Sequence, residues 1–576
     1  MVPHTARMNR VLLWLLLTIA AAGSAGILLA RRGAEERASN VAPAVAAILP
    51  DTFDEFTQRH LPAWKGEKPE LAILVTGQQH NYEAPCGCTE PQYGGLERRY
   101  NFITQLRSYG IPTVALDLGD MYASGRIVEQ SRLKYRVSMK ALALMGYDAI
   151  NVGPNEFHYP LIDALAETIL NAKVPYQILA ANIPNKDDYP GEDGSMLKDF
   201  RVIHPRGTKV RVGVVGTLGK SVVDAIVKRN STAPFARNID AIPAALRALQ
   251  AERPDVKVLL YQGSSDEARV LAQQLDEFDV IVCRSEESEP RTMELVPPAR
   301  GQTKRPKARI VYVGHKGRYI GALGVFRTAS GEWDLRWEPV RLSPELKTPP
   351  EKQEQHPIVQ LLEDYTRKLK DEDFVGKIIP AQHPVQARFN GKLVRYVGSE
   401  ACKDCHQAEY ESWDESRHAG AYPTLWEHPK SKPPHNREFD PECVICHTVG
   451  YGYMTGFRDN KSGYTDVEKS KHLLGVGCET CHGPGGLHVE RPNDKEIALA
   501  LSPWKEQPDD YLTPLAIKDN KSPEEQKQVS TREQTVADRV FRMCFQCHDT
   551  DNDHNFHLGK WLSIAHGKGP TVKKKK

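Results

Sequence analysis

The chain has 576 residues, which is enough for two to four domains with a hydrophobic core each. Its formal net charge is only +2, so the composition gives no reason to expect a nucleic acid as partner. Eight of the 11 cysteines and twelve of the 20 histidines follow residue 400, so most of the candidate chemistry lies in the C-terminal part.

The N-terminal segment is typical of an export signal. Two arginines precede the uncharged residues 11–30, and two more follow them. Twenty residues is the length of a membrane-spanning helix, while the stretch AAAGSAG also offers cleavage sites. We therefore expect residues 1–32 to be a signal peptide or membrane anchor and residues 33–69 to be a stalk. The bulk of the protein is predicted to be periplasmic or otherwise extracytoplasmic, anchored in the inner membrane by residues 11–30 if they are not cleaved.

Residues 70–345 show the alternation of an α/β domain. Eight apolar, β-branched runs predict buried strands: LAILVT, TVALDLG, DAINVG, YQILAAN, VRVGVVG, VKVLLY, FDVIVC and ARIVYVG. Helical patterns lie between several of them: Leu96 to Tyr109, Ser131 to Met145, Asp240 to Ala251 and Glu267 to Phe278. The expected architecture is layered sheets flanked by helices.

The phrases GGLERRYNFI, LDLGDMYASG, MGYDAINVGPNEF and VGHKGRYIGAL resemble the metallophosphoesterase domain of the 5'-nucleotidase family. That resemblance implies a layered sheet sandwich with a two-metal site. Only His80 and Asp120 occupy the family's ligand positions with suitable residues, and Glu287 is a further oxygen donor. The remaining positions hold Gln78, Pro154, Asn155, Gln262 and Ser285. Because a two-metal hydrolase needs several carboxylate and imidazole ligands, this departure argues against hydrolysis.

The loop after the first predicted strand carries Cys86 and Cys88 in APCGCTE. C-x-C is a tight spacing for an intramolecular disulfide, so an unbridged pair or a bridge to another chain is one interpretation. A soft-metal or redox site that includes His80 and Asp120 is the other. Cys283, inside an apolar run, is expected to be a buried core thiol.

Residues 346–395 are a proline-rich connector with a helical pattern from Ile358 to Lys370. Residues 396–576 then carry four copies of C-x-x-C-H. In this pattern two thiols attach one haem c, and the following histidine binds its iron. The predicted haem-binding residues are Cys402, Cys405 and His406; Cys443, Cys446 and His447; Cys478, Cys481 and His482; and Cys544, Cys547 and His548.

Zinc sites and disulfides are the alternatives to haem. Neither gives a reason for a histidine after every second cysteine. Four complete copies with no cysteine left over in this region therefore predict four haem c groups. Eight further histidines are candidates for the opposite iron face: His418, His428, His435, His472, His488, His554, His557 and His566.

The phrases around these motifs, among them ESRHAGAY, CHGPGGLH and WLSIAH, resemble the tetrahaem cytochrome c-554 family over about residues 396 to 567. The resemblance implies distal iron ligands at His418, His488 and His566. It also implies that one haem, by order the second, is five-coordinate on His447. From the sequence, His428 or His435 remains able to close that site.

The expected fold is therefore α/β, a metallophosphoesterase-like layered sheet sandwich, followed by a mostly α, loop-rich multihaem cytochrome c domain. Its expected function is electron transfer with redox partner proteins, the α/β domain being a docking or sensing platform. One alternative is a redox enzyme acting on a small nitrogen or sulfur compound, at an open haem or at Cys86 and Cys88. A second alternative is a working metal-dependent 5'-nucleotidase-like hydrolase.

Overall fold

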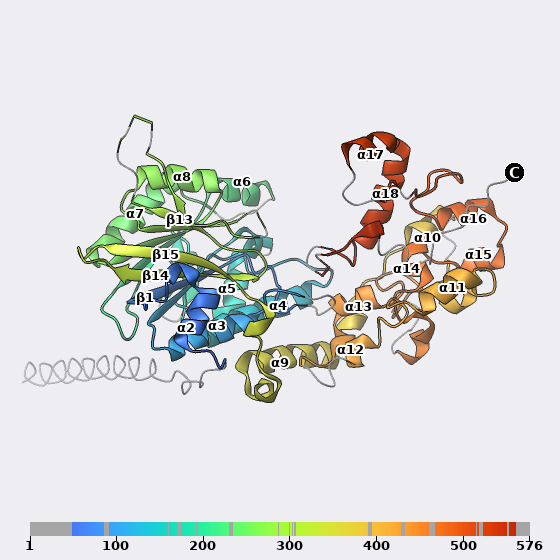
Figure 1. Ribbon diagram of the computed structural model, residues 1–576, viewed down its shortest axis with the longest axis horizontal. Helices are drawn as coiled ribbons and strands as arrows, with labels where there is room; N and C mark the ends of the chain where they lie inside the picture. Colours follow the sequence, from blue (N-terminus) through green and yellow to red (C-terminus); the bar gives the residue numbers. More distant parts are fainter. Residues whose placement is uncertain are drawn as a thin grey trace, which may run out of the picture. The chain divides into compact units, whose positions relative to one another are not determined.

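The computed structural model of the protein contains two facing β-sheets in its N-terminal half and short helices joined by loops in its C-terminal part (Figure 1). It describes residues 49–559 except 86–90, 159, 170–173, 192–193, 230–233, 286, 288, 299, 302, 304–306, 390–393, 428–432, 460–466, 514, 518–521, 550–551 and 554. The predicted anchor, residues 11–30, lies outside this part. Within it, no helix is long and apolar enough to span a membrane.

The larger sheet has seven strands in the order β15-β14-β1-β2-β3-β4-β7. Strands β1 to β4 and β7 run parallel to their neighbours in that series, and β14 pairs antiparallel with β1 and β15. The bounds are β1 Leu71–Thr76, β2 Thr113–Asp117, β3 Ala149–Asn151, β4 Gln177–Leu179, β7 Leu197–Lys198, β14 Tyr319–Arg327 and β15 Trp333–Arg341.

The smaller sheet has six strands in the order β12-β13-β11-β10-β9-β8. Its central strands β9, β10, β11 and β13 are parallel, and both edge strands are antiparallel. The bounds are β8 Phe200–Ile203, β9 Val212–Leu218, β10 Val256–Gln262, β11 Val280–Cys283, β12 Glu294–Leu295 and β13 Arg309–Tyr312. A separate two-stranded ribbon consists of β5 Pro190–Gly191 and β6 Gly194–Ser195.

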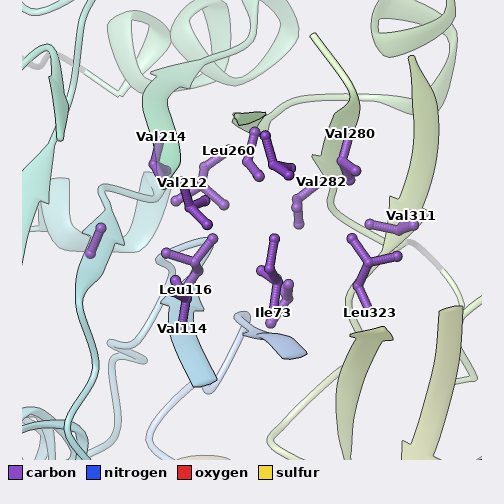
Figure 2. Packing of buried hydrophobic residues seen from close by; sticks show 14 of the residues in the cluster. Ile73, Val114, Leu116, Val212, Val214, Leu260, Val280, Val282, Val311 and Leu323 are labelled. Carbon is purple, nitrogen blue, oxygen red and sulfur yellow. The ribbon is translucent and has the colours of Figure 1, made fainter. Parts of the chain in front are cut away.

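The core of the α/β domain lies between the two sheets (Figure 2). Ile73 and Leu116 of the larger sheet and Val212 and Leu260 of the smaller one belong to a single cluster, and all four are fully buried. Strands covered on both faces must be apolar along their whole length. This requirement explains the uninterrupted runs that predicted them.

Helices cover the outer faces of the sheets. α7 and α8 bury their apolar sides on the smaller sheet, together with Phe278 and Cys283. The bounds in the α/β domain are α2 Phe53–His60, α3 Leu96–Ser108, α4 Val128–Leu144, α5 Leu161–Ile169, α6 Lys220–Lys228, α7 Asn238–Ala251 and α8 Ser265–Gln274. The 3₁₀ helices here are η1 Pro62–Trp64, η2 Pro154–His158, η3 Lys186–Asp188 and η4 Pro344–Leu346.

All eight predicted strands are present, but the two-residue strands β5, β6, β7 and β12 and the longer strands β8, β14 and β15 were not foreseen. β14 contains Gly321 and Gly324, and β15 contains Pro339. Glycine and proline are poor strand formers in general. β15 tolerates its proline because it is the edge strand of the sheet. Part of the predicted stalk is also folded, since Phe56, Leu61 and Trp64 are fully buried.

The connector contains η5 Pro350–Gln355, α9 Pro357–Asp371, η6 Phe374–Lys377 and α10 Pro384–Arg388. The C-terminal part is mostly α and loop-rich, as predicted. Its helices are α11 Gln407–Asp414, α12 Thr424–Glu427, α13 Pro441–His447, α14 Cys478–His482, α15 Gly486–Glu490, α16 Lys495–Ala500, α17 Pro523–Gln528 and α18 Thr531–Cys544, with η7 Ser399–Cys402, η8 Arg437–Phe439 and η9 Glu468–Leu473.

Candidate haem sites and the remnant metal centre

Each C-x-x-C-H motif lies on or beside a short helix. The second and third motifs fall within α13 and α14, the first begins at the end of η7, and the fourth begins at the last residue of α18. A helical turn brings the two cysteines, three residues apart, to one side. None of the nine described cysteines is in a disulfide.

Two pairs of histidine rings face each other. The ring centroids of His406 and His488 are 6.3 Å apart, and those of His418 and His548 are 6.1 Å apart. An imidazole nitrogen binds a transition metal at about 2.0 Å and lies roughly 1 Å from its ring centre, so two imidazoles on opposite faces of one iron have centroids about 6 Å apart. Both pairs therefore have the spacing of a bis-histidine haem. Each pair joins a predicted proximal histidine to a predicted distal one.

Three of the proximal histidines are held by a hydrogen bond at Nδ1. The partners are the carbonyl oxygen of Ala421 for His447 at 2.6 Å, that of Leu501 for His482 at 2.8 Å, and Asp553 Oδ2 for His548 at 2.8 Å. Such a bond fixes the tautomer and leaves Nε2 for a metal. His488 adds an Nδ1 that is buried without a hydrogen-bond partner. These features fit iron-binding histidines of a c-type haem.

The cysteines of different motifs lie close together. The Cys402 thiol forms a hydrogen bond with Cys478, and the Cys547 thiol forms one with Cys446. Cys481 lies near Cys544, and burial together with that neighbour raises the pKa of Cys481 to about 12. The motifs are therefore neighbours in the order first, third, fourth, second.

Glu479, inside the third motif, connects that motif to the first. Its buried carboxylate accepts hydrogen bonds from the backbone N–H groups of Val397, Gly398 and Gly485 at distances of 3.0 Å or less. Gly483 precedes Gly485 with φ +82°, and a Cβ there would lie 2.7 Å from His383 Cε1. The turn that leads to His488 therefore requires this glycine.

The other candidate histidines divide into two groups. His435 Nδ1 lies 2.7 Å from Glu363 of α9, and the rings of His472 and His557 are exposed. His428, His554 and the predicted distal ligand His566 lie outside the described residues. The distal ligands of the second and third motifs thus remain predictions.

In the α/β domain, His80 and Asp120 lie together at the carboxyl ends of the parallel strands, as the sequence predicted. His80 Nε2 is 2.8 Å from Asp120 Oδ2, and the His80 ring centroid is 5.1 Å from that of His315. Burial, and then the charges of His80 and Lys316, lower the pKa of His315 to about 4. His315 was not singled out from the sequence, although it lies in the phrase VGHKGRYIGAL.

Amide side chains occupy two of the positions where the family resemblance places metal ligands, and they bind protein groups there. Gln78 accepts from Ser285 N at 2.9 Å and donates to His315 Nε2 at 2.9 Å. Gln262 donates to the carbonyl oxygen of Leu118 at 3.3 Å. Among the described residues, no group of three or more His, Cys, Asp or Glu side chains could hold a metal ion.

Backbone strain remains at this site. Gln78, His80 and Asp120 have φ values of 51°, 50° and 67°. Left-handed φ is costly for residues other than glycine and clusters at functional sites. Next to them, the buried Glu156 accepts from four backbone N–H groups. Burial, followed by the nearby Asp120 carboxylate, raises the pKa of Glu156 to about 7.

Cys86 and Cys88 lie outside the described residues, so the geometry of that proposed redox site is not defined. Cys283 is fully buried, and burial raises the pKa of its thiol to about 12. A thiol of such high pKa is a poor nucleophile at neutral pH. Cys283 is therefore a core residue, as predicted.

Comparison with known proteins supports the haem interpretation of the C-terminal part. Residues 401–483 match the family of cytochrome c554 and c-prime. The chain is 36% identical over 98 residues to cytochrome c-554 of Nitrosomonas europaea, which is 16% of this chain and 39% of that protein. This similarity to a cytochrome c family implies haem c as the cofactor of the matched segment.

The α/β part is similar to 5'-nucleotidases. The chain is 32% identical over 153 residues to the snake venom 5'-nucleotidase of Gloydius brevicauda, which is 26% of this chain and 25% of that protein. Both of these matches span less than half the length of the relative. The crystal structure of a 5'-nucleotidase precursor from Thermus thermophilus aligns with 61% of this chain and 68% of its own, with 18% identity and a TM-score of 0.41. The chain is thus similar to 5'-nucleotidases in its α/β part and to the family of cytochrome c554 and c-prime over residues 401–483.

Proposed function

We propose that the protein is an exported tetrahaem c-type cytochrome that relays electrons between redox partner proteins. The observation that carries this proposal is the pair of histidine couples, His406 with His488 and His418 with His548, at the spacing that one iron requires. Haem c supplies an iron that gains or loses one electron. The chain supplies thiols for attachment, imidazoles for both iron faces and hydrogen bonds that orient them.

The contacts between cysteines support an ordered relay. Cys402 touches Cys478, Cys481 lies near Cys544, and Cys547 touches Cys446. Thiols that attach neighbouring porphyrins can be this close only if the porphyrin edges are adjacent. We infer that electrons pass along the motifs in the order first, third, fourth, second. The first and second motifs are then the two ends of the relay.

The α/β domain is proposed to dock or sense rather than to hydrolyse phosphoesters. Gln78 and Gln262 form internal hydrogen bonds where the family resemblance places metal ligands. An amide carries no charge, so it is a weaker metal ligand than a carboxylate or an imidazole, and Gln78 Oε1 is already used by the Ser285 N–H. His80 and Asp120 instead form a pair with each other.

A metal and activity assay tests this half of the proposal. We expect the purified full-length protein to hold no stoichiometric zinc or manganese. It should release no phosphate from AMP or bis(p-nitrophenyl) phosphate when Mg²⁺, Mn²⁺, Co²⁺ or Zn²⁺ is added. Turnover that is abolished in Asp120→Asn would show a working hydrolase and contradict the proposal.

A redox enzyme is the second candidate, and the second motif favours it. His435, one of the two histidines able to close that site, lies at the surface with its side chain 49% exposed, where Glu363 holds its Nδ1. An iron open on one face could bind a small nitrogen or sulfur compound. The pair Cys86 and Cys88 remains an alternative location for such chemistry.

Electron paramagnetic resonance of the oxidised holoprotein separates the two candidates. A relay predicts signals that are mainly low-spin and do not change with nitrite, hydroxylamine or nitric oxide. A high-spin signal that shifts on adding one of these compounds would favour the enzyme. Low-spin signals from all four irons would count against it.

A further inference from the structure

A partly buried group of charged side chains, with Glu83 and Lys134 at its buried end, connects the α/β domain to the helix of the second haem motif. Lys134 of α4 lies 3.1 Å from Glu83 Oε2 and 2.7 Å from Glu442 Oε2. Gln130, one turn earlier on α4, donates to Asp440 Oδ1 at 2.7 Å. We call Glu83, Lys134, Asp440 and Glu442 the interdomain cluster. It contains three carboxyl groups and one ammonium group.

The cluster lies close enough to the second haem motif for the charge of a haem bound there to change its proton affinity. Asp440 is the N-cap of α13 and accepts from the backbone N–H of Glu442 at 2.9 Å. The same helix carries Cys443, Cys446 and His447. From Asp440 to His447 the helix rises about 10 Å at 1.5 Å per residue. At that separation one elementary charge changes a proton affinity about tenfold for an effective dielectric constant near 20.

The cluster is also close to exchanging a proton near neutral pH. Burial, and then the carboxylate of Glu442, raise the pKa of Asp440 to about 6. Burial raises the pKa of Glu83 as well, against the effect of Lys134. The groups that interact with Asp440 are Lys134 and Gln130 of α4, Tyr365 of α9, Tyr451 and the neighbouring Glu442.

We propose that the interdomain cluster takes up one proton when the haem attached at the second motif gains an electron. The inference rests on the proposed function, because it requires a haem on Cys443 and Cys446. The electron comes from an external one-electron donor. The proton comes from solvent past Glu442, whose side chain is 52% exposed, and binds a carboxylate oxygen of Asp440. The electron and the proton leave again when the haem is reoxidised.

The sign of the effect follows from the charges. Reduction removes one positive charge near Asp440, so Asp440 binds a proton more tightly in the reduced protein. The reduction potential of this haem therefore falls as pH rises through the window around pH 6, and it is flat on either side. A tenfold difference in proton affinity corresponds to about 59 mV for a one-electron couple.

The test is a spectroelectrochemical titration of the full-length holoprotein between pH 4.5 and 8.5, with Asp440→Asn and Glu442→Gln beside the wild type. Asparagine keeps the helix cap of α13, so the first variant is expected to fold. We expect one of the potentials to fall by about 59 mV across the window in the wild type. At least half of that change should be lost in each variant. Glu524→Gln, an exposed carboxylate on α17, is the matched control and should behave as the wild type.

Haem quantification on the same samples distinguishes a failure of the proposed function from a failure of the inference about the interdomain cluster. If the second motif carries no haem, the proposed function fails. If it carries a haem but no potential depends on pH, the cluster inference fails alone. A pH dependence that is equal in the wild type and both variants would assign it to haem propionates and would also overturn the inference.

Discussion

Replacing His418 by methionine is expected to raise the reduction potential of the haem at the fourth motif by roughly 0.1 to 0.3 V. The His418 ring faces that of His548 at 6.1 Å, the spacing of two ligands on one iron. A thioether donates less charge to ferric iron than an imidazole, so it destabilises the oxidised form relative to the reduced one. The potentials are measured by redox titration of the visible spectrum. The low-spin signal of the oxidised protein should change at the same time.

His557→Met is the matched control, since the ring of His557 is exposed and follows the same motif. Its four potentials should equal those of the wild type. His488→Met should shift the potential of a different haem, the one at the first motif, because His488 faces His406. If His418→Met leaves every potential unchanged, this pairing is wrong.

Replacing Lys134 by methionine is expected to lower the free energy of unfolding by about 3 kcal/mol at pH 8. The side chain is 11% exposed and lies between Glu83, which is 5% exposed, and the half-exposed Glu442. Removing the ammonium group leaves the buried Glu83 carboxylate without its cation. Glu442 contributes little to the loss, because solvent screens it.

The loss should be smaller at pH 5 than at pH 8. The folded-state pKa of Glu83 is already raised by burial, and without Lys134 it lies higher still, so this carboxyl group is protonated more readily as pH falls. Chemical denaturation of the holoprotein at both pH values measures the difference. Lys140→Met, an exposed lysine on the same helix, should change the stability by less than about 0.5 kcal/mol. Equal losses for the two variants would show that the Lys134 contacts do not stabilise the protein.

Most of the fold could be predicted because its determinants are local. The eight apolar runs are long enough to identify the buried strands, and C-x-x-C-H identifies the attachment residues by spacing alone. The strands β14 and β15 escaped notice because Gly321, Gly324 and Pro339 obscure the strand pattern. β14 depends on pairing with β1, which lies more than 200 residues away in the chain, and β15 depends on pairing with β14.

The pairing that we propose for the iron ligands could not be read from the sequence. His418 precedes His548 by 130 residues, and only the tertiary fold selects His548 rather than the nearer His406. Glu479 was overlooked because the two middle positions of C-x-x-C-H carry no expected role. Lys134 was overlooked because a lysine in a helix is usually a solvated surface residue. The role of Lys134 is visible only from its contact with Glu442 of α13.

The most direct test of the central claim is the number of haems that the chain covalently carries. The intact mass of the purified protein, together with its pyridine haemochrome absorbance, should give four haem c groups per chain. A chain in which Cys544 and Cys547 are both replaced by alanine should carry three. Two or fewer haems in the wild type, or zinc bound stoichiometrically by the C-x-x-C pairs, would contradict the account.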